Sequence, residues 1–188
     1  MKEILSVLAG VLYIIGFIPY ILAILRQETK PAKASWLIWA SLNTIICAGM
    51  WLEDTVNGQI LGALIGVWVV AALVLRYGTP GWTRFDKFCL GGAALGIGLL
   101  AFASPVLSMM ISLIVAFIGS MPTFASAWHN PDRENKLAWT IFWVSGVCAI
   151  IAIPHWTLAN AAQPITFFTI DAIITGIVYL RPRPLAAA

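Results

Sequence analysis

Long apolar runs, separated by short polar or turn-forming stretches, recur along the whole chain. A helix that crosses a membrane needs about 20 mostly apolar residues. Two of the breaks are short, because they consist only of Ser104-Pro105 and Pro154-His155. The pattern predicts seven transmembrane helices, at residues 4–25, 34–51, 55–75, 85–103, 105–128, 137–153 and 156–180.

The composition supports an all-α integral membrane protein with membrane lipid around it. Of the 188 residues, 61% are hydrophobic and 10% are charged, whereas soluble domains are about half apolar and a quarter charged. The few, scattered cations disfavour a nucleic-acid partner. The three cysteines lie in apolar runs and the two histidines stand apart. We therefore expect no disulfide framework, no metal and no cofactor.

The charges divide between the two ends of the predicted helices. If the helices alternate in direction, ten of the eleven Lys and Arg residues gather on one side, and only Lys2 lies on the other. Lys and Arg are enriched on the cytoplasmic side of membranes, which predicts an outer N-terminus and a cytoplasmic C-terminus. The ten residues are Arg26, Lys30, Lys33, Arg76, Arg84, Lys87, Arg133, Lys136, Arg181 and Arg183.

Two parts of the sequence carry the same helix-breaking residues at one constant spacing. The segment GFIP, which begins at Gly16, recurs as GSMP 103 residues later. At the same shift, KASWLIW recurs as KLAWTIF. Apolar matches are common between membrane helices, but matched glycine, proline, lysine, tryptophan and asparagine are not. The pairs are Ile15 and Ile118, Gly16 and Gly119, Pro19 and Pro122, Lys33 and Lys136, Trp36 and Trp139, Ile38 and Ile141, and Asn57 and Asn160.

This spacing predicts two three-helix repeats, at residues 1–78 and 105–188, joined by a linker helix within residues 79–104. Three helices reverse the direction of the chain, and the linker helix restores it. The two repeats then have the same orientation and are related by an axis along the membrane normal. We expect them to enclose a central path.

Three helices, one helix and three helices, with a proline late in the first and fifth, resemble the PQ-loop superfamily, which includes the SWEET sugar carriers and bacterial nicotinamide riboside carriers. The likeness extends over the whole chain. The proline–glutamine pair of that family reads Pro19-Tyr20 and Pro122-Thr123 here, so both glutamines are absent. The resemblance implies a carrier of small polar solutes that works by alternating access in a bacterial inner (plasma) membrane.

Asp171 is the one acidic residue deep inside a predicted span. A carboxylate at the bilayer centre costs about 3 kcal/mol on insertion scales and faces the protein interior or a cavity. Its counterpart at the shift of 103 is Trp68. We expect the indole and the carboxyl to face each other across a substrate site. The alternative is that the hydroxyl of Thr169 or Thr175 satisfies the acid.

Asn43 and Trp143 extend this candidate site from the second and sixth helices. The Asn43 amide offers two donors and an acceptor, which suits a hydroxyl- or amide-bearing ligand. The alternative role for Asn43 is a hydrogen bond to a neighbouring helix.

Pro19 and Pro122 interrupt the first and fifth helices at matching depth. A proline removes a backbone hydrogen bond inside a helix, so the pair predicts two hinges of an inner gate. The alternative is a static kink in each helix.

Other residues have predicted structural roles. Trp36 and Trp139 are expected at the membrane interface, and Asn57 and Asn160 are expected to cap helix N-termini. Two glycine lines are expected to allow close helix packing, and they are Gly58, Gly62 and Gly66, and Gly92 and Gly96.

These features favour a membrane carrier for a small polar solute, such as a sugar, a nucleoside-like vitamin or an amino-acid-like solute. The alternative is a PQ-loop-type membrane receptor or sorting protein without transport. No cluster of converging His, Asp, Glu or Ser residues favours an enzyme. Removal of water from a carboxylate favours its neutral form, so proton coupling through Asp171 stays open, as does a homo-oligomer.

Overall fold

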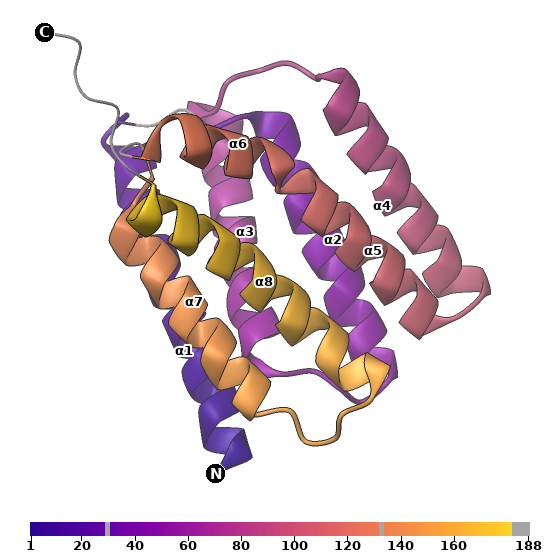
Figure 1. Cartoon of the computed structure of the whole chain (residues 1–188). Helices are drawn as coiled ribbons and strands as arrows, with labels where there is room; N and C mark the ends of the chain where they lie inside the picture. Colours follow the sequence, from indigo (N-terminus) through magenta and orange to yellow (C-terminus); the bar gives the residue numbers. More distant parts are fainter. Residues whose placement is uncertain (29–30, 132–133, 182–188) are drawn as a thin grey trace, which may run out of the picture.

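The computed structural model describes residues 1–28, 31–131 and 134–181, and within them the regular structure is helical (Figure 1). Each helix follows one of the apolar runs. The helices are α1 (Lys2–Leu25), α2 (Lys33–Leu52), α3 (Gly58–Tyr77), α4 (Arg84–Phe102), α5 (Pro105–Gly119), α6 (Met121–His129), α7 (Lys136–Ile151) and α8 (Leu158–Leu180).

The helices agree with an integral membrane protein. Within the described residues, six apolar helical stretches are long enough to cross a membrane, and one of them, Pro105–His129, comprises α5 and α6 together. The shorter apolar helix α7 brings the total to seven. Both weak breaks are confirmed, since α5 begins at Pro105 and α8 begins at Leu158 after a break at Pro154. The predicted bounds agree with these helices to within three residues.

The two predicted asparagine caps have different outcomes. Asn57 is the N-cap of α3, and its side chain accepts a hydrogen bond from the Ile60 backbone N–H at 3.0 Å. The prediction for Asn160 is wrong, because α8 begins earlier and is capped by Thr157. The Thr157 hydroxyl accepts from the Asn160 backbone N–H instead. Threonine is also a favoured cap, so asparagine identity alone could not fix this boundary.

The helices form two layers of three, with α4 at one edge (Figure 1). One layer holds α1, α3 and α2, with α3 in the middle. The other holds α7, α8 and the α5–α6 pair, with α8 in the middle. The layers join where α1 packs on α7 and where α2 packs on α5. Six spans thus form a closed ring, and α4 packs outside it against α5 and α2.

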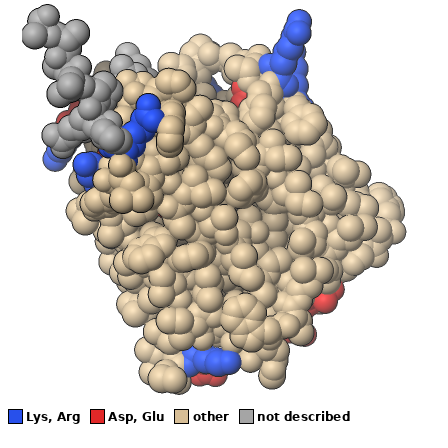
Figure 2. Space-filling view, viewed as in Figure 1, with Lys and Arg blue, Asp and Glu red and all other residues tan. Residues whose placement is uncertain are grey.

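Lys and Arg side chains stand at the two ends of the bundle and leave an uncharged belt between them (Figure 2). At the amino-terminal end, where α1 begins, lie Lys2, Glu3, Glu53 and Asp54. Lys30, Arg133 and Arg183 lie outside the described residues. The opposite end, called the basic end below, carries Arg26, Lys33, Arg76, Arg84, Lys87, Lys136 and Arg181.

Glycines allow α1 and α3 to approach each other closely. A Cβ atom at Gly58 would overlap the Ser6 carbonyl oxygen, and one at Gly62 would overlap the Gly10 carbonyl oxygen. Only glycine permits backbones to approach this closely, as is typical of membrane helix interfaces. The predicted close packing along this glycine line is confirmed. Gly92 and Gly96 of α4 serve α5 in the same way, against Val115 and Ser112.

The two matched prolines lie in different backbone settings. α1 continues through Pro19 to Leu25. The fifth span is interrupted, because α5 ends at Gly119 and α6 starts at Met121 with Pro122 in its first turn. Proline is tolerated in the first turn of a helix, where its missing N–H has no partner to lose. The helix break is therefore present in one repeat, and hinge motion stays a prediction in both.

Candidate functional site

Asp171 lies in the middle of α8 and is 2% exposed. Its Oδ2 atom is buried and has no hydrogen-bond partner among the described residues. The two threonine hydroxyls considered as partners are used elsewhere. Thr169 donates to the Ile165 carbonyl at 2.7 Å, and Thr175 donates to the Trp139 carbonyl at 3.1 Å. The alternative of an acid satisfied by a neighbouring hydroxyl is therefore wrong.

Asn43 of α2 is 7% exposed and has a similar unpaired oxygen. Its Nδ2 donates to the Trp39 carbonyl one turn earlier, at 2.9 Å. This bond fixes the amide so that Oδ1 points away from its own helix backbone, and Oδ1 is buried without a partner in the described structure. Asn43 thus bonds its own helix, and the alternative of a hydrogen bond to a neighbouring helix is wrong.

The helix register brings Asn43 and Asp171 to similar depth. Ile46 of α2 and Phe167 of α8 belong to one buried cluster. From that cluster Asn43 lies three residues toward the basic end on α2, and Asp171 lies four residues toward it on α8, because the two helices run in opposite directions. At 1.5 Å per residue, both lie about 5 Å from the cluster in the same direction. Both side chains are on buried faces.

Tyr13 of α1 completes the group, and sequence reasoning missed it. Its ring centroid lies 6.0 Å from Phe167 and 4.7 Å from Phe142. Tyr13 packs against both large buried clusters of the ring, and its neighbour Phe167 lies about one helical turn before Asp171 on α8. The constant shift pairs Tyr13 with Ala116, so the repeat gave no signal that could have found it.

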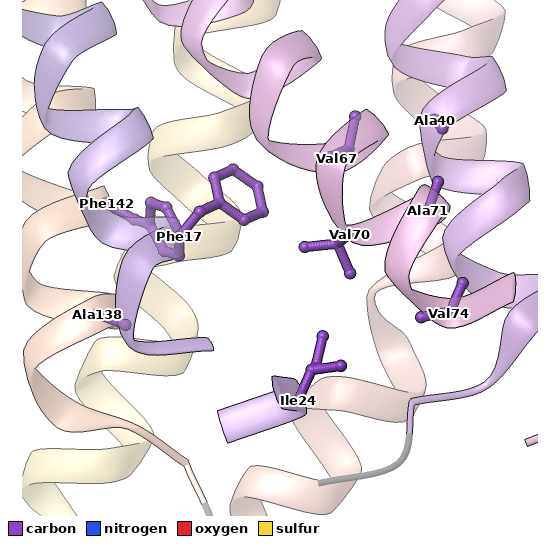
Figure 3. Packing of buried hydrophobic residues seen from close by; sticks show 9 residues of the cluster. All are labelled: Phe17, Ile24, Ala40, Val67, Val70, Ala71, Val74, Ala138 and Phe142. Carbon is purple, nitrogen blue, oxygen red and sulfur yellow. The ribbon is translucent and has the colours of Figure 1, made fainter. Parts of the chain in front are cut away.

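Toward the basic end the ring is filled by an aromatic cluster, defined as Phe17, Trp36, Trp139 and Phe142. The Phe17 ring lies 5.1 Å from that of Phe142 and 6.4 Å from that of Trp36. Figure 3 shows Phe17 and Phe142 against each other between α1 and α7. Trp139 lies 5.7 Å from Phe142. These aromatic side chains come from three helices and fill the half of the helix ring that lies toward the basic end.

The interfacial belt of Trp36 and Trp139 stays a prediction. Both indoles are partly buried and pack against the core cluster that contains Phe17 and Phe142. The Trp139 Nε1–H donates to Glu134 Oε2 at 2.9 Å, at the start of α7 and the basic end of the bundle. An indole can bury its ring while its N–H bonds a polar partner, so these contacts agree with both an interfacial and a core role.

Toward the amino-terminal end the two middle helices are joined by an amide bridge, defined as Asn57, Gln59 and Gln163. Asn57 Nδ2 donates to Gln163 Oε1 at 2.8 Å, and Gln163 Nε2 donates to Gln59 Oε1 at 3.1 Å. Both glutamines are fully buried. Sequence reasoning missed this bridge, although two glutamines inside apolar helices are a usable signal of interhelical bonding.

Asp171 lies between the amide bridge and the aromatic cluster, which are called the two closures below. It is eight residues beyond Gln163 on α8, or about 12 Å along the helix axis. It is one turn before Thr175, which bonds the Trp139 backbone. The carboxyl is thus separated from the amino-terminal end by the amide bridge and from the basic end by the aromatic cluster.

Trp68 and Trp143 are not brought to this group. Trp68 is 47% exposed on the outer face of α3, beside Ile65 and Val69, and its Nε1–H donates to Thr44 Oγ1 at 3.0 Å. The expectation that it faces Asp171 is therefore corrected. Trp143 is 37% exposed on α7 and packs against Phe168, with ring centroids 6.3 Å apart. The sequence placed both tryptophans at the depth of Asp171, but depth does not determine the face of the helix on which a side chain lies.

Two surface pockets are present, and neither is lined by Asp171, Asn43 or Tyr13. A pocket of about 530 Å³ opens at the basic end around Arg76, Tyr77 and Thr79. A second, of about 290 Å³, lies between α5 and α8 and is lined mainly by apolar side chains. Neither contains the buried polar atoms that a specific solute site requires. We therefore give more weight to the buried group than to either pocket.

Comparison with family models, with curated proteins and with solved structures gave no match for this chain. The resemblance to the PQ-loop superfamily accordingly stays a prediction, and function is inferred from the chain's own residues.

Proposed function

We propose that the protein is a carrier that moves a small polar solute across the membrane by alternating access. The solute site comprises the buried side chains of Asp171 and Asn43 and the half-buried ring of Tyr13. In this proposal the basic end faces the cytoplasm, in line with the distribution of Lys and Arg. The single observation that carries the proposal is a buried carboxylate in the middle of the helix ring with an oxygen that no described residue satisfies.

The order of helices in the ring supports two equivalent halves. Exchange of the first and fifth spans, the second and sixth, and the third and seventh leaves every neighbour relation unchanged. The contact of α1 with α7 becomes that of α5 with α2, and the contact of α3 with α2 becomes that of α8 with α7. A two-fold arrangement of this kind is typical of carriers whose site lies between repeats.

The duplicated glycines support the same relation at the level of side chains. A Cβ atom at Gly16 would lie 2.5 Å from the Phe142 ring, and one at Gly119 would lie 3.3 Å from Trp39 Nε1. Phe142 and Trp39 are themselves counterparts at the shift of 103. Each GxxP segment therefore receives an aromatic ring from the other proposed repeat. This shared contact gives a physical reason why both glycines recur.

The two closures support alternating access. The amide bridge joins α3 to α8 by two hydrogen bonds, and each neutral hydrogen bond contributes only about 1 kcal/mol net. The aromatic cluster closes the other half by ring packing. Opening one closure at a time would expose the site to one side of the membrane. The helix break between α5 and α6 is positioned for the inner movement, with Pro122 beside it.

Transport by purified protein in liposomes tests the proposal. A panel of labelled sugars, nucleosides, amino acids and amines should include solutes whose uptake saturates and is lost in Asp171→Asn. Asp86→Asn is the matched control, since Asp86 is a buried aspartate of α4, outside the ring. Binding without flux would favour the receptor alternative, and neither flux nor thermal stabilisation across the panel would refute the carrier.

A further inference from the structure

We infer that the solute is a small organic cation that carries N–H donors, such as an ammonium or guanidinium group. This inference rests on the proposed function and names the class of substrate for the same site. It depends on which polar atoms are left without partners, which charges surround them and which aromatic rings lie beside them.

The unpaired atoms of the site are acceptors. In its ionised form the Asp171 carboxylate accepts hydrogen bonds and donates none, and the Asn43 amide already donates to the Trp39 carbonyl. The buried atoms left over are Asp171 Oδ2 and Asn43 Oδ1. Each of these atoms needs a hydrogen-bond donor, and a solute with several N–H groups supplies donors to both. The hydroxyl oxygens of a polyol would also need donors from the protein, and the Tyr13 side chain offers only one, its hydroxyl.

With Asp171 ionised, the site would carry a negative charge, and no Lys or Arg of the described residues lies at its depth. Every Lys and Arg among the described residues lies near a helix end or beyond it. Arg181, the cation nearest along α8, is ten residues away, or about 15 Å along the helix. An unpaired carboxylate in a low-dielectric interior is costly unless an opposite charge pairs with it. A cationic solute would supply that charge.

The rings beside the carboxyl also suit a cation. Tyr13 lies against Phe142 and Phe167 on one side of the group, and aromatic faces attract ammonium and guanidinium groups, most strongly where water is excluded. Two other buried atoms lack partners, Gln59 Nε2 and Ser112 Oγ. They lie at the amide bridge and against α4, so they do not alter the acceptor character of the site.

The test compares labelled guanidinium, urea, tetramethylammonium and glucose in proteoliposomes. Urea has the planar shape of guanidinium and its N–H donors but no charge. Tetramethylammonium has the charge but no N–H donors. We expect saturable guanidinium uptake that exceeds both by about tenfold or more, because charge-assisted hydrogen bonds are each equivalent to about that factor. Asp171→Asn should lower guanidinium uptake by a similar factor, and Asp86→Asn should not.

Each result has one meaning. Uptake of glucose or urea without uptake of guanidinium overturns the inferred substrate class and leaves the carrier intact. Equal uptake of guanidinium and tetramethylammonium overturns the role of N–H donors. No uptake of any solute in the wider panel overturns the carrier itself. If Asp171→Asn does not fold, thermal unfolding of the wild-type protein decides, because millimolar guanidinium should raise its midpoint and equal urea should not.

Discussion

Two buried aspartates in this molecule have opposite surroundings. Asp86, at the start of α4, accepts hydrogen bonds from the Thr83 backbone N–H at 2.9 Å, the Thr83 hydroxyl at 2.6 Å and the Ser35 hydroxyl at 3.1 Å. Asp171, in the middle of α8, has an Oδ2 atom with no partner among the described residues. Their exposed fractions are similar, 7% and 2%.

The difference separates a structural acid from a candidate functional one. Asp86 and Thr83 form a capping box that satisfies free N–H groups at the start of α4. Such an acid stabilises the fold without any ligand. A buried acid without partners costs stability and is retained where it has another use. Burial does not distinguish the two acids, whereas the number of hydrogen bonds that each one accepts does.

The largest expected effect comes from replacing the unsatisfied acid by an apolar residue. Asp171→Leu should abolish solute uptake. Stability should stay the same or rise by about 1–3 kcal/mol, because a buried atom without a partner is removed. Thermal unfolding in detergent and uptake into proteoliposomes measure the two effects. A loss of stability of more than about 1 kcal/mol would show that Asp171 has a structural partner and would break the contrast with Asp86.

Asn43→Leu sharpens the contrast, because Asn43 Oδ1 is the second unpaired acceptor. Uptake should fall by about tenfold, the equivalent of one lost hydrogen bond to a charged group. Stability should change by less than about 1 kcal/mol, since the one bond lost is made to the Trp39 carbonyl of its own helix. Comparison of initial uptake rates at equal protein density checks this. Unchanged uptake would remove Asn43 from the site.

The sequence predicted the spans well and the directions of side chains around them poorly. Hydropathy located the helices because each span must cross the thickness of the membrane, and proline marked the breaks because it has no backbone N–H to donate. Trp68 shows the limit: lipid and protein interior are both apolar, so nothing in the pattern indicated that this tryptophan points outward. Tyr13 and Gln163 were missed because their roles depend on contacts between helices that are distant in sequence.

Asp86→Ala tests the satisfied member of the pair. The substitution removes the capping box and the hydrogen bond from Ser35, so stability should fall by about 1–2 kcal/mol. Uptake per folded molecule should be unchanged, because α4 packs outside the ring. Asp86→Asn should recover part of the stability, since its side-chain oxygen still accepts from the Thr83 backbone. A variant that is stable but no longer transports would place Asp86 in the functional group and erase the distinction.

The smallest effect is expected for Thr169→Val, which removes the hydroxyl nearest to Asp171 along α8. That hydroxyl donates to the Ile165 carbonyl of its own helix, and the replacement keeps nearly the same shape. Hydroxyls bonded in this way contribute little to helix stability, so stability should change by less than about 0.5 kcal/mol and uptake should not change. Falling uptake would instead show that transport depends on a second polar group of α8, because residues two apart on a helix do not face each other. The contrast between Asp171 and Asp86 would then no longer be enough to define the functional group.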